Sequence, residues 1–142
     1  MIKSTELMIG DYVLVDGKPR RVESITKKKI GYHINPQTDK RLYYARLHDI
    51  APIDINEEFL KENGFSESRP CGNFNDYGNF SEIIRYLTIF DMNDHIMTSG
   101  FYIPNDDGSS TNIGRISMLQ TYYLHQLQQT YRLWGIQKDW KL

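Results

Sequence analysis

Residues 122–135 read Tyr-Tyr-Leu-His-Gln-Leu-Gln-Gln-Thr-Tyr-Arg-Leu-Trp-Gly, and this segment decides the fold. At 3.6 residues per turn, one face of a helix collects Tyr123, Leu127, Thr130, Tyr131 and Trp134. The opposite face collects Gln126, Gln129 and Arg132. Gly135 follows, and glycine readily adopts the left-handed conformation that ends many helices. The pattern predicts a helix over residues 121–134 whose apolar face covers a sheet.

The first 53 residues contain short apolar or β-branched stretches separated by turn residues. We expect strands over residues 12–15, 20–26, 29–34, 41–45 and 48–50. In the second stretch Val22 and Ile25 break the period of two, which predicts a bulge or bend near Glu23. Short strands in such close succession predict a small, strongly bent barrel.

A short helix is predicted within residues 54–65. Asn56 is a suitable N-cap, and two glutamates follow it in the first turn, where the helix dipole favours them. Gly64 is placed to end the helix. Phe59 and Leu60 are expected to face inward.

The second half of the chain mixes loops with strands. Residues 66–81 are rich in Gly, Asn and Ser and predict a loop. β-branched and aromatic residues predict a strand over 83–90 and, after a turn, a return strand over 95–103. A second loop over 104–112 and a third strand over about 113–117 precede the final helix.

Together these patterns predict an α+β fold. Residues 9–25, I-G-D-Y-V-L-V-D-G-K-P-R-R-V-E-S-I, resemble the opening of small SH3-like barrels. We therefore expect an SH3-like β-barrel over residues 1–53. Residues 54–142 are expected to form a subdomain that shares its core with the barrel. In it a short linking helix precedes an antiparallel hairpin or small sheet packed on the C-terminal helix.

The composition predicts a folded protein without disulfides, metal or cofactor. The apolar fraction of 39% is low, but 13% of the residues are aromatic and supply large contact areas. Cys71 is the only cysteine and has no Cys or His cluster around it, so we expect neither a disulfide nor a zinc site. The polar N-terminus and the absence of a long apolar run predict a cytoplasmic protein that does not bind membranes.

The four histidines and the acidic turns form no catalytic or metal-binding motif. Residues 91–95, Asp-Met-Asn-Asp-His, resemble a calcium loop but lack the glycine at its sixth position and the glutamate at its twelfth. No glycine-rich phosphate loop occurs. For His125 we expect a structural hydrogen bond to a backbone group, with a ligand or catalytic role as the alternative. We expect no enzymatic activity.

Charge is unevenly distributed along the chain, although its net value is −1. Residues 1–53 carry ten Lys or Arg against six Asp or Glu, whereas residues 54–114 carry three against eleven. The candidate surface for nucleic acid or a partner comprises Arg20, Arg21, Lys27, Lys28, Lys29, Lys40, Arg41 and Tyr43. Tyr32 and Tyr44 lie nearby in the sequence, and basic strands interleaved with aromatic residues suit phosphate neutralisation and base stacking. The alternative is that these lysines only keep sheet edges soluble.

Three motifs occur in a fixed order along the chain: T-E-L-x-I-G-D-Y-V, P-I-x-I-N-E-E-F-L-K-E-N-G-F and Y-L-H-Q-L-Q-Q-T-Y-R-L-W-G. Together they resemble a group of small proteins encoded by phages, prophages and mobile elements of gut bacteria. These typically end in a helix of the form Y-x-H-x-L-Q-x-x-Y followed by glycine, matched here at Tyr123, His125, Leu127, Gln128, Tyr131 and Gly135. The resemblance implies a context and a fold but no activity.

Two functions follow from these patterns. The first is a non-catalytic protein-interaction or adaptor module of phage or mobile-element origin, which binds a protein partner or itself through the barrel or an exposed sheet edge. The second is nucleic-acid binding through the basic face of the N-terminal barrel. Salt dependence of binding separates them, because phosphate binding weakens steeply with salt.

Overall fold

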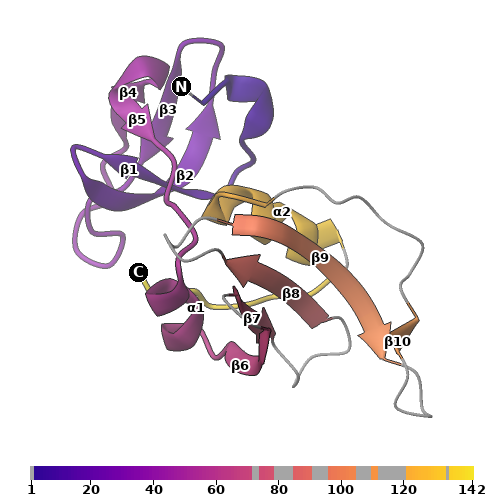
Figure 1. Ribbon diagram of the computed structural model, residues 1–142. Coiled ribbons are helices and arrows are strands. Elements are labelled where there is room, and N and C mark those ends of the chain that lie inside the picture. The colour runs from indigo at the N-terminus through magenta and orange to yellow at the C-terminus, as the bar shows by residue number, and fades with distance from the viewer. Residues whose placement is uncertain are drawn as a thin grey trace. The chain divides into compact units, whose positions relative to one another are not determined.

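The computed structural model (Figure 1) describes residues 2–71, 74–78, 85–90, 96–104, 110–111, 121–133 and 135–142. The chain forms two units, of which the first comprises Met1–Asp54 and Tyr123–Asp139. The second comprises Ile55–Tyr122 and Trp140–Leu142. The C-terminal helix, which we expected within the subdomain of residues 54–142, therefore groups with the N-terminal strands instead.

A curled, five-stranded antiparallel sheet forms a half-barrel in the first unit, with strand order β4-β3-β2-β1-β5 (Figure 1). Its strands are β1 (Tyr12–Val15), β2 (Lys18–Ile25), β3 (Lys29–Tyr32), β4 (Tyr43–Arg46) and β5 (Ile50–Ala51). Two 3₁₀ turns accompany them, η1 (Ser4–Glu6) and η2 (Leu47–Asp49). The α+β class and the five strands are confirmed, while the narrower SH3-like identity stays a prediction.

β2 carries the predicted irregularity. The register of its pairing with β3 shifts between Val22, which lies opposite Tyr32, and Ser24, which lies opposite Gly31. Glu23 is the extra residue, as the broken apolar period indicated. Most of the other strand ends differ by one or two residues from the predicted ones. Residues 47–49 form η2, where the start of the fifth strand was predicted.

The core of the first unit is apolar and continuous. It consists of Ile2, Leu7, Val13, Val15, Val22, Ile30, Ala45 and Ile50. On β1 the buried residues Val13 and Val15 alternate with half-buried ones, because successive side chains of a strand point to opposite faces.

Helix α2 (Leu124–Leu133) packs against β1 within the same unit. Leu124 and Leu127 are fully buried and Tyr131 nearly so. The predicted face is thus right at Leu127 and Tyr131 but omits Leu124, and Trp134 lies outside the described residues. Packing of α2 on the second sheet, which we also expected, stays a prediction.

The two ends of the segment between β5 and α2 are held together. Asp54 and Tyr123 form an isolated antiparallel bridge, and the Leu124 N–H donates to the Ile53 carbonyl at 2.9 Å.

At the other end of α2, Gly135 has a φ of +72°, which only glycine adopts without strain and which ends the helix as predicted.

The second unit begins with the predicted linking helix, α1 (Glu57–Glu62). The Asn56 side chain accepts the Phe59 N–H at 2.8 Å, which confirms the N-cap. Gly64 follows the helix with a φ of +84°. Phe59 and Leu60 are buried, as predicted.

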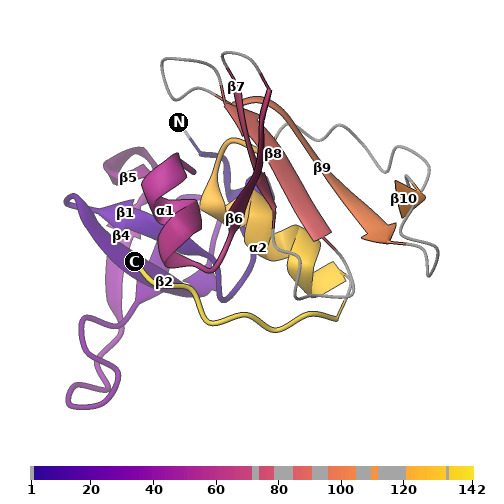
Figure 2. The ribbon, with the colours of Figure 1, turned by 60° about the horizontal axis from the view of Figure 1, so that its bottom comes forward.

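The C-terminal residues pack beside α1, where both views of the ribbon place them (Figures 1 and 2). The Trp140 ring stacks on Phe59 and Phe65, with ring centroids 5.9 and 6.4 Å apart. The Asn63 side chain bonds the Lys141 backbone twice, donating to its carbonyl at 3.1 Å and accepting its N–H at 2.9 Å. These contacts fix the end of the chain on the second unit.

The remaining strands form a second antiparallel sheet with the order β10-β9-β8-β7-β6 (Figure 2). Its strands are β6 (Ser66–Cys71), β7 (Phe74–Gly78), β8 (Arg85–Phe90), β9 (Ile96–Pro104) and β10 (Ser110–Thr111). β8 and β9 confirm the two strands predicted at 83–90 and 95–103. The turn at 91–94 and the third strand at 113–117 lie outside the described residues.

The loop predicted over residues 66–81 is wrong, because β6 and β7 pair as antiparallel strands there. β7 also pairs with β8, so its backbone groups bond on both sides. Strand formation in such a position depends on neighbouring strands more than on intrinsic propensity, and therefore Gly, Asn and Ser are tolerated. Likewise, β10 lies within the segment predicted as the second loop.

Candidate functional site

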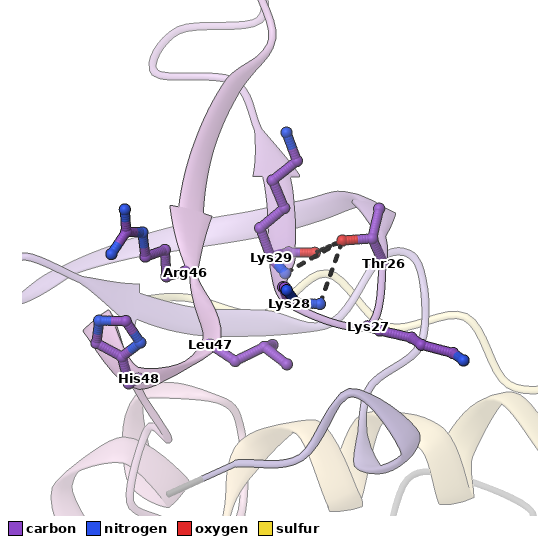
Figure 3. A pocket seen from close by; sticks show the side chains of 7 residues that line it. All are labelled: Thr26, Lys27, Lys28, Lys29, Arg46, Leu47 and His48. Carbon is purple, nitrogen blue, oxygen red and sulfur yellow. Dashed lines mark hydrogen bonds between the residues drawn. The ribbon is translucent and has the colours of Figure 1, made fainter.

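A wide groove of about 850 Å³ opens on the first unit, between the β2–β3 turn and the end of β4 (Figure 3). Its lining residues are Thr26, Lys27, Lys28, Lys29, Arg46, Leu47 and His48. Five of the seven carry basic side chains and none is acidic. Lys27 points away from Arg46 and His48, so the basic groups are distributed along the groove (Figure 3).

Thr26 builds the turn that carries the three lysines. Its hydroxyl donates to the Lys29 carbonyl at 3.0 Å and accepts the N–H groups of Lys28 and Lys29 at 3.4 and 3.1 Å (Figure 3). The Thr26 N–H also donates to the Lys29 carbonyl, at 2.9 Å. The turn is joined to η2 because the Leu47 N–H donates to the Lys28 carbonyl at 3.0 Å. These bonds hold the two basic segments beside each other.

The strand register places further residues beside this groove. Lys29 pairs with Arg46, and Gly31 pairs with Tyr44. These four positions share the face of β3 and β4 opposite to the buried Ile30 and Ala45. Tyr44 is 54% exposed, and the Lys29 ammonium lies 4.1 Å from its ring centroid. An exposed aromatic ring therefore adjoins the basic groove.

Gly31 explains the shape of this outer face. A Cβ atom at this position would collide with the Ser24 hydroxyl and would lie 3.0 Å from the Leu42 side chain. Leu42 and Ser24 therefore cover the Gly31 backbone directly, next to Tyr44. The absence of a side chain at this position lets Ser24 of β2 and Leu42, which precedes β4, approach the backbone closely.

The structure brings only some of the predicted binding residues together. Lys27, Lys28 and Lys29 line the groove, whereas the other five candidates do not. Arg20 lies over the Tyr32 ring at 5.8 Å and donates to the Ile34 carbonyl at 3.3 Å.

The remaining candidates lie away from the groove lining as well. Arg21 pairs with Glu23 at 3.0 Å. Lys40 and Arg41 are exposed in the segment before β4. The Tyr43 hydroxyl donates to Asp39 Oδ2 at 2.8 Å.

Asp39 and Tyr43 influence each other's ionisation. The Arg41 N–H donates to Asp39 Oδ1 at 2.9 Å, and together with the Tyr43 hydroxyl it lowers the pKa of Asp39. The bond to Asp39 raises the pKa of Tyr43. The Tyr43 hydroxyl is thus engaged within the chain.

Sequence reasoning missed Arg46 and His48, whereas Tyr44 was among the aromatic residues expected beside the basic strands. Tyr44 lies within the predicted fourth strand, whereas Arg46 follows the predicted end of that strand at residue 45. Their place beside Lys29 depends on the β3–β4 register, which no local pattern specifies.

No protein-family model, no curated protein and no solved structure matches the chain.

A second polar cluster joins α2 to the segment before β1. The fully buried Asp11 carboxylate accepts the Met8 N–H at 2.7 Å and the Gln129 side chain at 2.6 Å, and it pairs with Arg132. The Arg132 guanidinium also donates to the Ile9 carbonyl at 3.2 Å. Because every described partner is a group of the same unit, the cluster is structural.

Gln128 satisfies a backbone group that the sheet leaves unpaired. This buried side chain accepts the N–H of Tyr12, the first residue of β1, at 2.9 Å. A buried N–H without such an acceptor is costly. The glutamine therefore helps to fix the helix on the strand.

His125 lies in α2 with 2% of its surface exposed. Its ring stacks on Tyr123 at 5.8 Å, and its Nδ1 has no hydrogen-bond partner among the described residues. The expected bond to a backbone group is therefore absent at Nδ1. Burial lowers the pKa of His125, and the nearby carboxylates of Asp11 and Glu6 only partly oppose this effect. Burial therefore favours the neutral form of the imidazole.

Stability will depend on pH through His125. Its folded-state pKa lies below the ordinary value of 6.5, so the unfolded chain takes up the proton first as pH falls. The contribution is complete above pH 6.5 and declines below it, by at most about 1.4 kcal/mol per pH unit. Urea unfolding of the wild type and of His125→Gln between pH 5 and 8 measures this. Parallel stability curves for the two proteins would contradict the assignment, and His48→Gln, at an exposed position, is the control.

Among the described residues, no group of three or more His, Cys, Asp or Glu side chains is arranged to hold a metal ion. In the same part of the chain, no helix has both the length and the apolar character needed to cross a membrane.

Proposed function

We propose that the protein is a non-catalytic, cytoplasmic module that binds nucleic acid, with the phosphates held in the basic groove of the first unit. The observation that carries the proposal is that Lys27, Lys28, Lys29, Arg46 and His48 line one groove that has no acidic lining residue. Cations that face a strand of phosphates release its condensed counterions on binding, which drives association.

The groove cations are available for a ligand. In the part of the chain that the structure describes, no ion pair forms at Lys27, Lys28 or Arg46, and only His48 has a carboxylate partner, Asp49 at 3.2 Å. By contrast, Arg21 and Arg132 are both paired. Phosphates can therefore bind in the groove without first breaking an internal pair at three of its five basic residues.

The exposed aromatic ring favours nucleic acid over a purely acidic ligand. Tyr44 is more than half exposed and adjoins the groove through Lys29. A site for acidic peptides needs only positive charge, whereas bases also offer flat faces to an aromatic ring. The sequence favoured a protein-interaction module over nucleic-acid binding. We place nucleic-acid binding first because of this ring beside the basic groove.

A protein partner is the second candidate function, supported by the edge strand β4, which has β3 as its one neighbour among the described strands. An unpaired strand edge can accept a further strand from another chain. The SH3-like character of the sheet, supported by residues 9–25, and a phage or mobile-element origin, supported by the three sequence motifs, belong to this proposal. Sedimentation over a hundredfold concentration range tests self-association at this edge.

Neutralising the groove will weaken binding and its salt dependence. We expect the double variant Lys28→Gln and Arg46→Gln to bind a mixed-sequence 20-nucleotide strand about tenfold or more weakly than the wild type. Each lost phosphate contact lowers the slope of log K against log salt by about 0.7 for single strands and about 0.9 for duplex. Fluorescence anisotropy with labelled oligonucleotides between 50 and 200 mM salt measures both quantities.

The matched control is Lys18→Gln with Lys40→Gln, because both lysines are exposed and neither lines the groove. It removes the same charge from the same unit, so nonspecific electrostatics would weaken both double variants equally. That outcome would reject the groove as the site. The absence of salt-dependent binding at 50 mM would reject nucleic-acid binding altogether.

A further inference from the structure

We infer that the groove takes an unpaired strand, with one base stacked on Tyr44 and its flanking phosphates on Lys28, Lys29 and Arg46; this inference rests on the proposed function. The observations that carry it are the exposure of Tyr44, its register on β4 and its contact with Lys29.

Tyr44 is placed as a platform rather than as a core residue. It faces outward from β4, two residues before Arg46, and its cross-strand neighbour is Gly31, which has no side chain. Leu42, two residues earlier on the same face, lies over Gly31. Tyr44 therefore stands opposite a position without a side chain, and more than half of its surface is in solvent.

Lys29 connects this platform to the groove. Its ammonium lies 4.1 Å from the centroid of the Tyr44 ring, and the same residue lines the groove with Lys28 and Arg46. More than half of the Tyr44 surface stays exposed beside this ammonium, and this exposed part is where a base can stack. A nucleotide stacked there has its phosphate next to a row of cations.

Only an unpaired strand can use both features. In a duplex the flat faces of each base are covered by its neighbours in the stack, so the outside of the helix offers phosphates and base edges alone. An exposed ring on a sheet therefore adds nothing to duplex binding. Stacking of one free base on an aromatic side chain strengthens binding about 5- to 150-fold.

Anisotropy titrations of the full chain test the inference with four ligands of one length and charge density per strand. These are a mixed-sequence 20-nucleotide single-stranded DNA, the RNA of the same sequence, the DNA duplex and an abasic single strand. We expect both single strands with bases to bind more tightly than the duplex and the abasic strand. The ratio of the dissociation constants of the single-stranded DNA and the RNA identifies the preferred sugar.

The decisive variants are Tyr44→Ala and Tyr44→Phe. The alanine should lose about 5- to 150-fold in affinity for the single strands with bases and leave duplex and abasic binding unchanged. The phenylalanine retains the ring and should bind like the wild type. Circular dichroism confirms that each variant folds, and the exposed position of Tyr44 favours this.

The outcomes separate this inference from the proposed function. Equal affinity for all four ligands, with Tyr44→Ala unchanged and the Lys28 and Arg46 double variant weakened, would overturn the unpaired-strand inference and leave nucleic-acid binding intact. The lack of salt-dependent binding to every ligand would overturn both. If a 20-residue polyglutamate bound as tightly as the DNA strand, the groove would be a general anion site and both proposals would fail.

Discussion

Leu127→Ala will lower the free energy of unfolding by about 2–5 kcal/mol. Leu127 is fully buried in α2, on the face that also buries Leu124 and Tyr131. Truncation removes the transfer free energy of the lost methyl and methylene groups and leaves a cavity that the surrounding core fills only in part. Urea denaturation followed by far-UV circular dichroism measures the loss as a lower midpoint at an unchanged slope.

Leu133→Ala is the matched control on the same helix. Leu133 is 82% exposed, so the same chemical change there should alter stability by less than about 0.5 kcal/mol. Equal effects of the two substitutions would mean that α2 does not bury its Leu127 face against the first unit.

Asp11→Ala is the second substitution with a large expected effect, a loss of about 3 kcal/mol. The carboxylate is fully buried, and its removal leaves the Met8 N–H, the Gln129 amide and the Arg132 guanidinium without their acceptor. Arg132 keeps 32% of its side-chain surface in solvent, so water can solvate part of the guanidinium, which holds the loss near the lower end for a broken buried pair.

A double-mutant cycle isolates the ion pair from the rest of this cluster. Asp11→Asn, Arg132→Gln and the double variant should give a coupling free energy of about 0.5–3 kcal/mol, as contacting residues in one network do. Thermal or urea unfolding of the four proteins provides it. Additive effects within about 0.3 kcal/mol would show that Arg132 does not depend on Asp11.

Local signals in the sequence correctly predicted helix caps, helix ends and a β-bulge. The Asn56 cap, the glycines at 64 and 135, and the bulge at Glu23 are all present. Each depends on the conformational preference of one residue and its immediate neighbours, and tertiary contacts rarely alter these preferences. The inward faces of Leu60 and Leu127 follow from helical periodicity in the same way.

Pairing between distant segments could not be predicted. Asp11 and its partners on α2 lie 118 and 121 residues apart, so an acidic residue in a turn gave no sign of being buried. Residues 66–71 and 74–78 form strands because β8 accepts β7 as a neighbour and β7 pairs in turn with β6. A sequence pattern with many turn residues describes the isolated segment and not the sheet that it joins.

The candidate site shows the same limit. The three consecutive lysines were visible as a basic stretch, and they do line the groove. Arg46 and His48 join them only because the β3–β4 register and the bond from Leu47 to Lys28 place η2 there. Arg20 and Arg21 were equally visible, but they bind Tyr32 and Glu23 instead.

The helix that completes the first unit is encoded after the whole second sheet, and this order constrains how the protein is made. Residues 2–54 emerge from the ribosome without Gln129 and Arg132, the side-chain partners of Asp11, and without the helix that packs on β1, because all of these belong to α2. The half-barrel therefore cannot finish folding until about 80 further residues have been synthesised. By then the second sheet has emerged, so it can fold before the half-barrel does. This order is the reverse of the usual one, in which the N-terminal domain folds first during synthesis. A chain shortened before residue 124 would lose the stability of its N-terminal unit as well as its last helix.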